Sequence, residues 1–373
     1  MKTITIVEVN KVIDFPPVHN VIKTLLVNGC RVNLISRSID GLPGTIINNE
    51  NFTGYEIPWI KEKGIITKIK HRVKLNHYVR SQTVKCMENS DFLWTTSINS
   101  IRELRHDVSK YKHIFQLMEL TRYGYLTSLH IKYSLADIAK NAWKVVTPEI
   151  NRAYIERVWW NLDTLPTVLP NKPFDIGTGN LTEELQPALE KVKNEKRKII
   201  LYLGGIFSDR NLETIAKAVK NSNDYVLYIV GKVFSKSGQE KIDYLLSNYP
   251  IEYLGGFNPP VHLNFVKYAY MGVLPYKPVK SQSSSELNAL YCAPNKIFEY
   301  AGFGIPMIGS DVLGLKLPFE KWNIGCCYED TSVDSIITAI NNVDKEHDVM
   351  SRNCLAFYDS VDLHKIVMKI MEE

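Results

Sequence analysis

The residue types that could do chemistry together are concentrated in one stretch, Pro294 to Gly309. Lys296 and Glu299 are three residues apart, so they share one face of a short helix near its N-terminus, where Asn295 is a candidate N-cap. A lysine beside a helix N-terminus binds phosphate, and a glutamate one turn deeper accepts hydrogen bonds from vicinal hydroxyls such as those of a ribose. The pair therefore predicts a nucleotide-sugar site; the alternative is an ordinary surface charge pair.

The rest of the stretch fits a helix followed by a buried strand. Gly302 and Gly304 would end the helix, and 306–308 would start the strand. The stretch resembles the nucleotide-binding motif of retaining, glycogen-synthase-like GT-B glycosyltransferases (family 4-like), in which Pro-Asn-Lys-x-x-Glu-Tyr precedes Gly-x-Pro and a strand. The resemblance covers most of residues 165–340. It implies an α/β protein of GT-B fold, with two doubly wound, Rossmann-like domains and a cleft between them.

The hydrophobic pattern independently predicts such elements. A chain of 373 residues exceeds one ordinary core, so two domains are expected. Strands and helices alternate in both halves, which indicates parallel, doubly wound sheets. The expected strands are 3–9, 31–36, 91–96, 113–118 and 143–147, then 198–203, 225–230, 251–255 and 271–276.

Prolines and Asn171 between 166 and 194 mark the domain boundary. We expect an acceptor-binding domain over 1–172 and a nucleotide-sugar-binding domain over 173–355. A C-terminal helix over 356–373 has an apolar face and, as the resemblance implies, packs back on the first domain.

Glycines follow the strands of the second half, at the edge where doubly wound sheets bind ligands. Gly204 and Gly205 let backbone N–H groups approach a diphosphate, and the resemblance assigns a diphosphate contact to Arg210. Arg210 and Lys296 are thus the expected groups that stabilise the leaving diphosphate. Further nucleotide contacts are expected at Gly231, Lys232, Leu254, Gly255, Gly256 and Asn295.

The chain departs from the family pattern at two places. Many members carry a glutamate eight residues before the one matching Glu299, where this chain has Tyr291. The loop 285–291, with Asn288 and Tyr291, is the expected donor-sugar loop. In the first domain, the glycine-rich loop after the first strand is replaced by 14–19, which contains prolines.

The first domain offers two further features. Glu119 follows an expected strand and is a candidate catalytic contact to sugar hydroxyls, or else a helix-capping carboxylate. Residues 61–85 combine basic and apolar side chains, which indicates either contact with an anionic membrane surface or a solvated helix over the core. The basic residues are Lys61, Lys63, Lys68, Lys70, Arg72, Lys74, Arg80 and Lys85.

Composition limits the function classes. Net charge is +5 and no binding module is present, so nucleic acid is not expected. The six cysteines lack metal-ligand spacing, and the chain opens directly as a strand, so a cytoplasmic protein without a signal peptide is expected, peripheral at the membrane if residues 61–85 bind it. No metal or other cofactor is expected to be required.

These observations predict a nucleotide-sugar-dependent glycosyltransferase, hexosyltransferase-like and retaining by resemblance. It would act on a glycan or lipid-linked acceptor hydroxyl in surface polysaccharide synthesis, such as capsule or lipopolysaccharide. A UDP-sugar is the expected donor, with GDP- and TDP-sugars as alternatives. A nucleotide-sugar epimerase of the same fold and a non-catalytic glycosyltransferase-like subunit stay open.

Overall fold

The computed structural model describes residues 1–58, 65–126, 131–179, 183–207, 210–278 and 286–372. The chain divides into two compact units. The N-terminal unit comprises Met1–Pro170 together with Asp362–Glu373, and the C-terminal unit comprises Asn171–Val361. The divisions thus fall at 170/171 and 361/362, close to the expected 172/173 and six residues beyond the expected 355/356.

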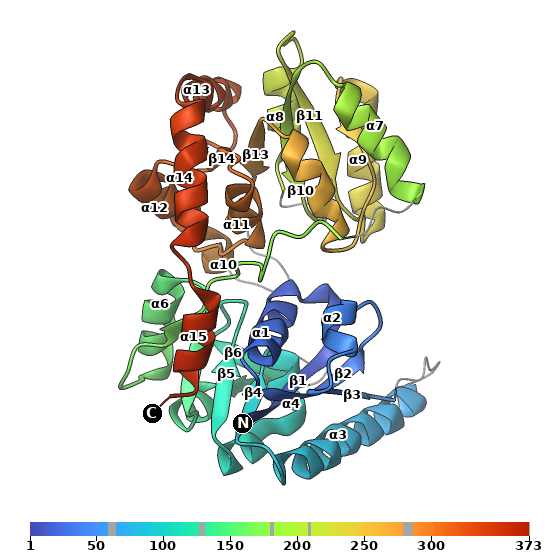
Figure 1. Ribbon diagram of the computed structural model, residues 1–373, viewed down its shortest axis with the longest axis vertical. Coiled ribbons are helices and arrows are strands. Elements are labelled where there is room, and N and C mark those ends of the chain that lie inside the picture. The colour runs from blue at the N-terminus through green and yellow to red at the C-terminus, as the bar shows by residue number, and fades with distance from the viewer. Residues whose placement is uncertain (59–64, 127–130, 180–182, 208–209, 279–285, 373) are drawn as a thin grey trace. The chain divides into compact units, whose positions relative to one another are not determined.

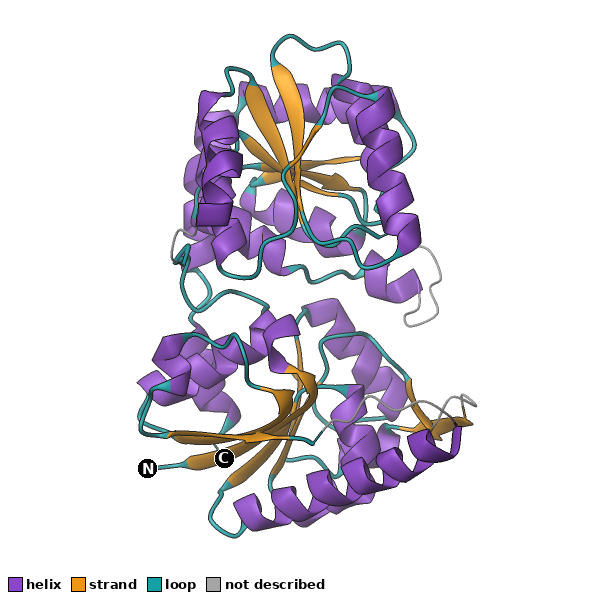
Figure 2. Cartoon of the chain, turned by 90° about the vertical axis from the view of Figure 1, so that its right-hand side faces the viewer, coloured by secondary structure: helices purple, strands orange, loops and turns teal. Residues whose placement is uncertain are grey.

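A seven-stranded parallel sheet forms the centre of the N-terminal unit (Figure 2). Its order is β3-β2-β1-β4-β5-β8-β9, so the chain starts in the middle and winds outward in both directions. Short apolar strands buried on both faces favour this parallel arrangement. The strands are β1 (Thr3–Lys11), β2 (Arg31–Ser38), β3 (Phe52–Glu56), β4 (Phe92–Thr95), β5 (His113–Gln116), β8 (Lys144–Thr147) and β9 (Thr167–Val168).

Helices lie on both faces of this sheet, and one hairpin stands apart from it (Figure 2). The antiparallel hairpin of β6 (Tyr123–Leu126) and β7 (Ile131–Ser134) was not expected from the sequence, and neither was β3. The helices are η1 (Val12–Asp14), α1 (Pro16–Val27), α2 (Gly44–Ile47), α3 (Ile65–Met87), α4 (Ile98–Leu104), η2 (Arg105–Lys110), α5 (Ala136–Lys140) and α6 (Ile150–Trp160).

The C-terminal unit repeats this topology with six parallel strands in the order β12-β11-β10-β13-β14-β15. This order corresponds to 3-2-1-4-5-6, that of the dinucleotide-binding doubly wound fold. The strands are β10 (Lys198–Leu203), β11 (Tyr225–Val230), β12 (Glu252–Tyr253), β13 (Met271–Leu274), β14 (Met307–Ser310) and β15 (Gly325–Tyr328).

Successive residues of β10 supply two hydrophobic cores, one on each face of the C-terminal sheet. Leu201 and Leu203 pack with η4, α7, α11, α12 and α14, whereas Ile200 and Tyr202 pack with α8, α9 and α13. The helices are η3 (Glu183–Leu185), α7 (Gln186–Asn194), α8 (Leu212–Val219), α9 (Lys236–Asn248), η4 (Val261–Tyr268), α10 (Glu286–Leu290), α11 (Asn295–Gly302), α12 (Leu313–Trp322), α13 (Val333–Lys345) and α14 (His347–Asp359).

The C-terminal segment differs from the single helix expected over 356–373. Helix α14 ends at Asp359, and a separate helix, α15 (Leu363–Ile370), begins after Asp362 caps it by accepting from the Lys365 N–H at 2.9 Å. Such a carboxylate cap satisfies a free N–H group and defines a new helix start. Helix α15 belongs to the N-terminal unit, where it contacts α1 (Figure 1) and where Lys2 Nζ donates to the Met371 carbonyl at 2.9 Å.

Candidate nucleotide-binding site

Three glycine turns lie side by side at the carboxyl edge of the C-terminal sheet. The Gly204 N–H donates to the Val230 carbonyl at 2.9 Å, and the Gly231 N–H donates to the Gly255 carbonyl at 2.8 Å. A Cβ added to Gly231 would lie only 1.7 Å from the Gly204 carbonyl oxygen. The turns after β10, β11 and β12 are thus in contact through backbone atoms, and glycine at Gly231 is a steric requirement.

Lys296 crosses this edge from helix α11. A Cβ built on Gly204 would meet Lys296 Cε at 2.5 Å and Nζ at 3.0 Å, and Gly204 has φ +143°, a conformation that other residues rarely adopt. The lysine side chain therefore lies directly against the phosphate-binding turn expected from the sequence. Burial lowers the pKa of Lys296, and the nearby charge of Arg210 lowers it further, while Glu299 opposes both effects.

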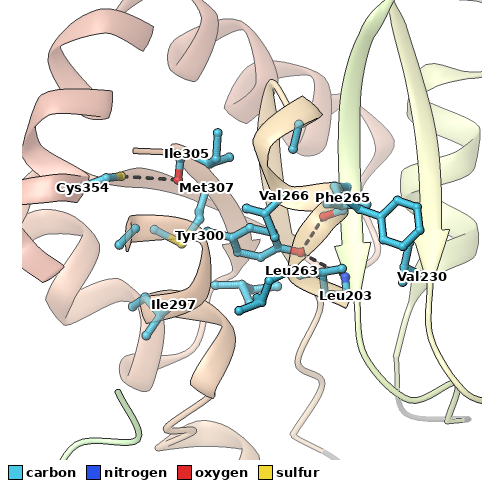
Figure 3. Packing of buried hydrophobic residues seen from close by; sticks show 14 of the residues in the cluster. Leu203, Val230, Leu263, Phe265, Val266, Ile297, Tyr300, Ile305, Met307 and Cys354 are labelled. Carbon is cyan, nitrogen blue, oxygen red and sulfur yellow. Dashed lines mark hydrogen bonds between the residues drawn. The ribbon is translucent and has the colours of Figure 1, made fainter. Parts of the chain in front are cut away.

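The next residue after Glu299 fixes α11 on the sheet. Tyr300 is fully buried, and its hydroxyl donates to the Leu201 carbonyl at 2.7 Å and accepts from the Leu203 N–H at 3.0 Å (Figure 3). Strand β13 pairs with β10 only as far as Leu201, so the hydroxyl takes the place of the next ladder bonds. The ring fits because Gly272 has no side chain: a Cβ there would lie 2.5 Å from Tyr300 Cδ2.

Tyr300 therefore sets the distance between α11 and the end of β10, one residue before Gly204. No role was expected for Tyr300 from the sequence. A signal was present, because a tyrosine on the buried face of a helix needs a hydrogen-bond partner for its hydroxyl.

Glu299 is buried within reach of a histidine that sequence reasoning missed. Glu299 Oε2 lies 3.5 Å from His262 Nε2, and the two side chains are 10% and 14% exposed. Burial would raise the pKa of Glu299, but the imidazole of His262 and the ammonium of Lys296 lower it below its ordinary value. The carboxyl group is therefore ionised and can accept hydrogen bonds. No sequence spacing connects His262 to Glu299, since they lie in separate elements.

Arg210 lies over an aromatic ring close to the same edge. Its guanidinium carbon is 4.3 Å from the centre of the Tyr276 ring, and burial raises the pKa of that tyrosine, so its phenol stays neutral. Stacking on an aromatic face suits a guanidinium and holds its N–H fork in a defined plane. Arg210 is also close enough to Lys296 to affect its pKa. Arg210 and Lys296, the two cations expected to contact a diphosphate, are thus close enough to influence each other electrostatically.

The remaining expected contacts are placed as follows. Lys232 is exposed, its stem lies across Gly256, and its ammonium donates to the Asn258 side chain. Leu254 is half-buried and packs against the core, and its N–H donates to the Ile229 carbonyl at 2.9 Å. Asn295 is the first residue of α11 rather than its N-cap, because Pro294 takes the cap position without a side-chain bond.

The expected donor-sugar loop over 285–291 is mostly a helix. Ser285 lies outside the described residues, and 286–290 form α10, since Glu, Leu and Ala favour helix. Asn288 lies in this helix, and Tyr291 follows it, with its N–H donating to the Leu287 carbonyl at 2.9 Å. The Tyr291–Cys292 backbone touches α12: a Cβ on Gly314 would meet the Cys292 carbonyl oxygen at 2.3 Å.

Two of the expected features, Glu119 and the basic segment 61–85, belong to the N-terminal unit. Glu119 is exposed, just after β5. Of the basic segment 61–85, residues 61–64 lie outside the described residues. Arg72 pairs with Glu103 at 2.8 Å, and Arg80 pairs with Asp107 at 3.4 Å, while Val79, Thr83 and Cys86 of α3 are buried. Helix α3 therefore covers the core of the N-terminal unit through one face.

Among the described residues, no three His, Cys, Asp or Glu side chains lie together where they could hold a metal ion. In the same part of the chain, every helix is too short or too polar to cross a membrane.

Comparison with known proteins shows the fold. No protein-family model matches the chain, and no curated protein matches it in sequence. Solved structures match over its whole length. Sucrose-phosphate synthase from Thermosynechococcus elongatus is 14% identical, with a TM-score of 0.73, over 100% of this chain and 98% of that chain.

Two other matching structures involve UDP: one holds UDP, and the other is named for a UDP-sugar. Anabaena HepE, in complex with UDP and glucose, is 11% identical with a TM-score of 0.68, covering 100% of this chain and 98% of that chain. A putative UDP-N-acetylglucosamine 2-epimerase from Listeria monocytogenes is 12% identical with a TM-score of 0.60, covering 99% and 94%. With its two parallel sheets of seven and six strands, this chain has the GT-B fold.

Proposed function

We propose that this chain is a glycosyltransferase that takes a sugar from a nucleoside diphosphate sugar and transfers it to an acceptor hydroxyl. One observation carries the proposal: the Lys296 side chain lies against the Gly204 turn while an ionised Glu299 is buried one helical turn away. Backbone N–H groups and a cation suit a diphosphate, and a carboxylate suits a ribose diol. Those two groups together are what a nucleoside diphosphate presents.

The chemistry needs charge stabilisation more than an enzymic base. When the bond from the anomeric carbon to the diphosphate breaks, negative charge develops on the leaving phosphate oxygens. Lys296 and Arg210 would stabilise that charge from two elements. The N–H of Gly205 would add a donor, whereas the Gly204 N–H already donates to the Val230 carbonyl. Retention of anomeric configuration is proposed from the sequence resemblance, and Glu119, Asn288 and Tyr291 are proposed as sugar contacts.

UDP is the proposed donor nucleotide, because solved structures of the same fold hold UDP. Calorimetry of the full chain with UDP, GDP, TDP and CMP tests this. We expect UDP to bind most tightly, and saturation by another nucleotide with none by UDP would correct the base. The absence of any nucleotide binding would remove the proposed function.

An epimerase is the second candidate, favoured by the structural match to the putative 2-epimerase. Incubation with a UDP-sugar and no acceptor separates the two activities. A transferase releases UDP only slowly without an acceptor, whereas an epimerase interconverts sugar isomers with the UDP bond re-formed. A folded chain that binds UDP but does neither with a panel of acceptors would instead be a non-catalytic partner subunit.

The proposed acceptor is a glycan or lipid-linked hydroxyl in surface polysaccharide synthesis, reached at an anionic membrane surface through residues 61–85. Arg72 and Arg80 are engaged by Glu103 and Asp107, so this part of the proposal depends on the six lysines of the segment. Co-sedimentation with phosphatidylglycerol vesicles, compared with phosphatidylcholine vesicles, measures it. Equal recovery with both would remove the membrane proposal and leave the transferase proposal intact.

A further inference from the structure

His262 lies in η4 and faces the carboxylate of Glu299 on α11. Its Nε2 is 3.5 Å from Glu299 Oε2, and both side chains are largely buried. The contact lies at the upper limit for a hydrogen bond and can shorten when a ligand draws the carboxylate into place. Neither the sequence motif nor the proposed chemistry assigns a role to this histidine.

The other ring nitrogen determines which way the hydrogen bond runs. Nδ1 of His262 is buried and has no hydrogen-bond partner among the described residues. A carboxylate only accepts, so the nitrogen that faces Glu299 must carry the proton. His262 is thus an Nε2–H donor to Glu299.

The histidine is held rigidly. Leu263, Phe265 and Val266 of η4 lie in the hydrophobic core of the sheet. The buried Asn264 side chain donates to the Thr178 carbonyl at 2.7 Å and to the Val261 carbonyl at 3.0 Å. Since core packing and buried hydrogen bonds fix the backbone on both sides of His262, the imidazole has a defined position.

Glu299 has two cationic or donor neighbours with different duties. Lys296 extends over Gly204, where the diphosphate is proposed to bind. If Glu299 had Lys296 as its sole partner, the carboxylate would draw the ammonium away from the phosphate and lose its own orientation. A second donor to the carboxylate removes that competition.

We propose that His262 is a positioning residue: it orients the Glu299 carboxylate toward the ribose hydroxyls and leaves Lys296 for the diphosphate. This inference rests on the proposed nucleotide-binding function and deepens it. It predicts that His262 contributes to recognition of the 2′ and 3′ hydroxyls, although it does not itself touch the ribose.

The test measures the affinity of the full chain for UDP and for 2′,3′-dideoxy-UDP by calorimetry. His262→Leu should reduce the preference for UDP over the dideoxy compound roughly tenfold, the size of a hydrogen bond to a charged group. His262→Gln should restore most of the preference, because its amide nitrogen can reach the place of Nε2, whereas His262→Asn should not. In a Glu299→Gln background, His262→Leu should change nothing further.

Each alternative result overturns the inference in a recognisable way. An equal loss of affinity for both nucleotides in His262→Leu and His262→Gln would show a purely structural role. An unchanged preference in a folded variant would show that Glu299 is oriented by other groups. If the wild-type chain binds neither nucleotide, the proposed function itself fails. If the wild-type chain binds UDP but the His262 variants do not show the expected loss of preference, only the role of His262 fails and the proposed function stands.

Discussion

The two sheets have similar doubly wound topologies, but different residues occupy their carboxyl edges. In the N-terminal unit, Glu8 ends the buried part of β1 and accepts hydrogen bonds from Thr96 Oγ1 at 2.8 Å, Ser97 Oγ at 3.1 Å and Asn10 at 2.6 and 3.0 Å. In the C-terminal unit, the equivalent edge carries Gly204, Gly231 and Gly255. The N-terminal edge surrounds a buried carboxylate with internal donors, whereas the C-terminal edge brings glycine backbones into direct contact with one another.

The difference shows that the doubly wound fold brings the carboxyl ends of the strands together, while the residues at those ends determine the chemistry of the edge. Burial raises the pKa of Glu8, although its hydrogen bonds oppose that shift, so the carboxyl group serves the stability of its own unit. At the C-terminal edge the side chains that approach are cations, Lys296 and Arg210, and the turns lack Cβ atoms. These features are the reason for proposing that an anion binds at this edge.

The largest effect is expected from adding a side chain to a glycine at the C-terminal edge. Gly231→Ala places a Cβ 1.7 Å from the Gly204 carbonyl oxygen, so the turns must separate. We expect a loss of roughly 3 kcal/mol or more in the free energy of unfolding, since overpacking acts here on backbone. Chemical denaturation measures it.

Gly255→Ala is the matched control. Gly255 has φ +90° but nothing within 4 Å of its Cβ position, so only backbone strain of about 1–2 kcal/mol is expected. Equal losses in the two variants would show that the contact between the turns is not tight.

The N-terminal unit can be probed through its other buried acid. Glu156 of α6 is 1% exposed, neither carboxylate oxygen has a hydrogen-bond partner among the described residues, and burial raises its pKa from 4.5 to about 8 against the opposing charge of Arg152. Between pH 4.5 and about 8, Glu156 releases its proton in the unfolded chain and keeps it in the folded chain. Stability therefore falls as pH rises, by roughly 3 kcal/mol between pH 4.5 and 7.

Glu156→Gln removes this titration, so its unfolding free energy should decline less with pH than that of the wild type. Denaturant titrations at pH 5, 6, 7 and 8 give the difference between the two curves. Parallel curves would mean that Glu156 is ionised in the folded protein.

Tyr300→Phe tests the hydrogen bonds that connect α11 to β10 at the C-terminal edge. It leaves the Leu201 carbonyl and Leu203 N–H without their shared hydroxyl partner, which should cost about 2 kcal/mol and weaken UDP binding as α11 shifts. Tyr133→Phe is the control in the N-terminal unit, because the buried Tyr133 hydroxyl has no hydrogen-bond partner among the described residues. That change should be nearly neutral; a comparable loss would point to ring packing rather than the hydroxyl.

The smallest effect on the fold, and the most direct on function, is expected from Lys296→Ala. Loss of a charge-assisted phosphate contact should weaken UDP binding by about 1.5–3 kcal/mol without unfolding the chain. Lys217→Ala is the control, since Lys217 of α8 is exposed, pairs with Glu213 at 2.9 Å and is not among the expected nucleotide contacts. Unchanged UDP affinity in a folded Lys296→Ala protein would remove the central assignment.

Much of the fold could be predicted because its signals are local. Runs such as 198–203 and 225–230 have the length and apolar content of buried strands, and both are strands in the structure. The β6–β7 hairpin was missed because its strands have four residues each, and its paired ends, Leu126 and Ile131, are separated by more than the two residues that give the strongest hairpin signal. The break between α14 and α15 was missed because an apolar face continues across it, while the Asp362 cap that separates them is a single side chain.

The sequence by itself determined the alternation of elements, the helix that carries Lys296 and Glu299, and the glycines after the strands, because periodicity and turn chemistry act over a few residues. Only the tertiary structure decided that Tyr300 completes the hydrogen bonding of β10, that Gly231 must lack a side chain because of Gly204, and that His262 faces Glu299. These contacts join residues 27 to about 100 positions apart. Their formation depends on how whole strands and helices pack, and no local pattern records that.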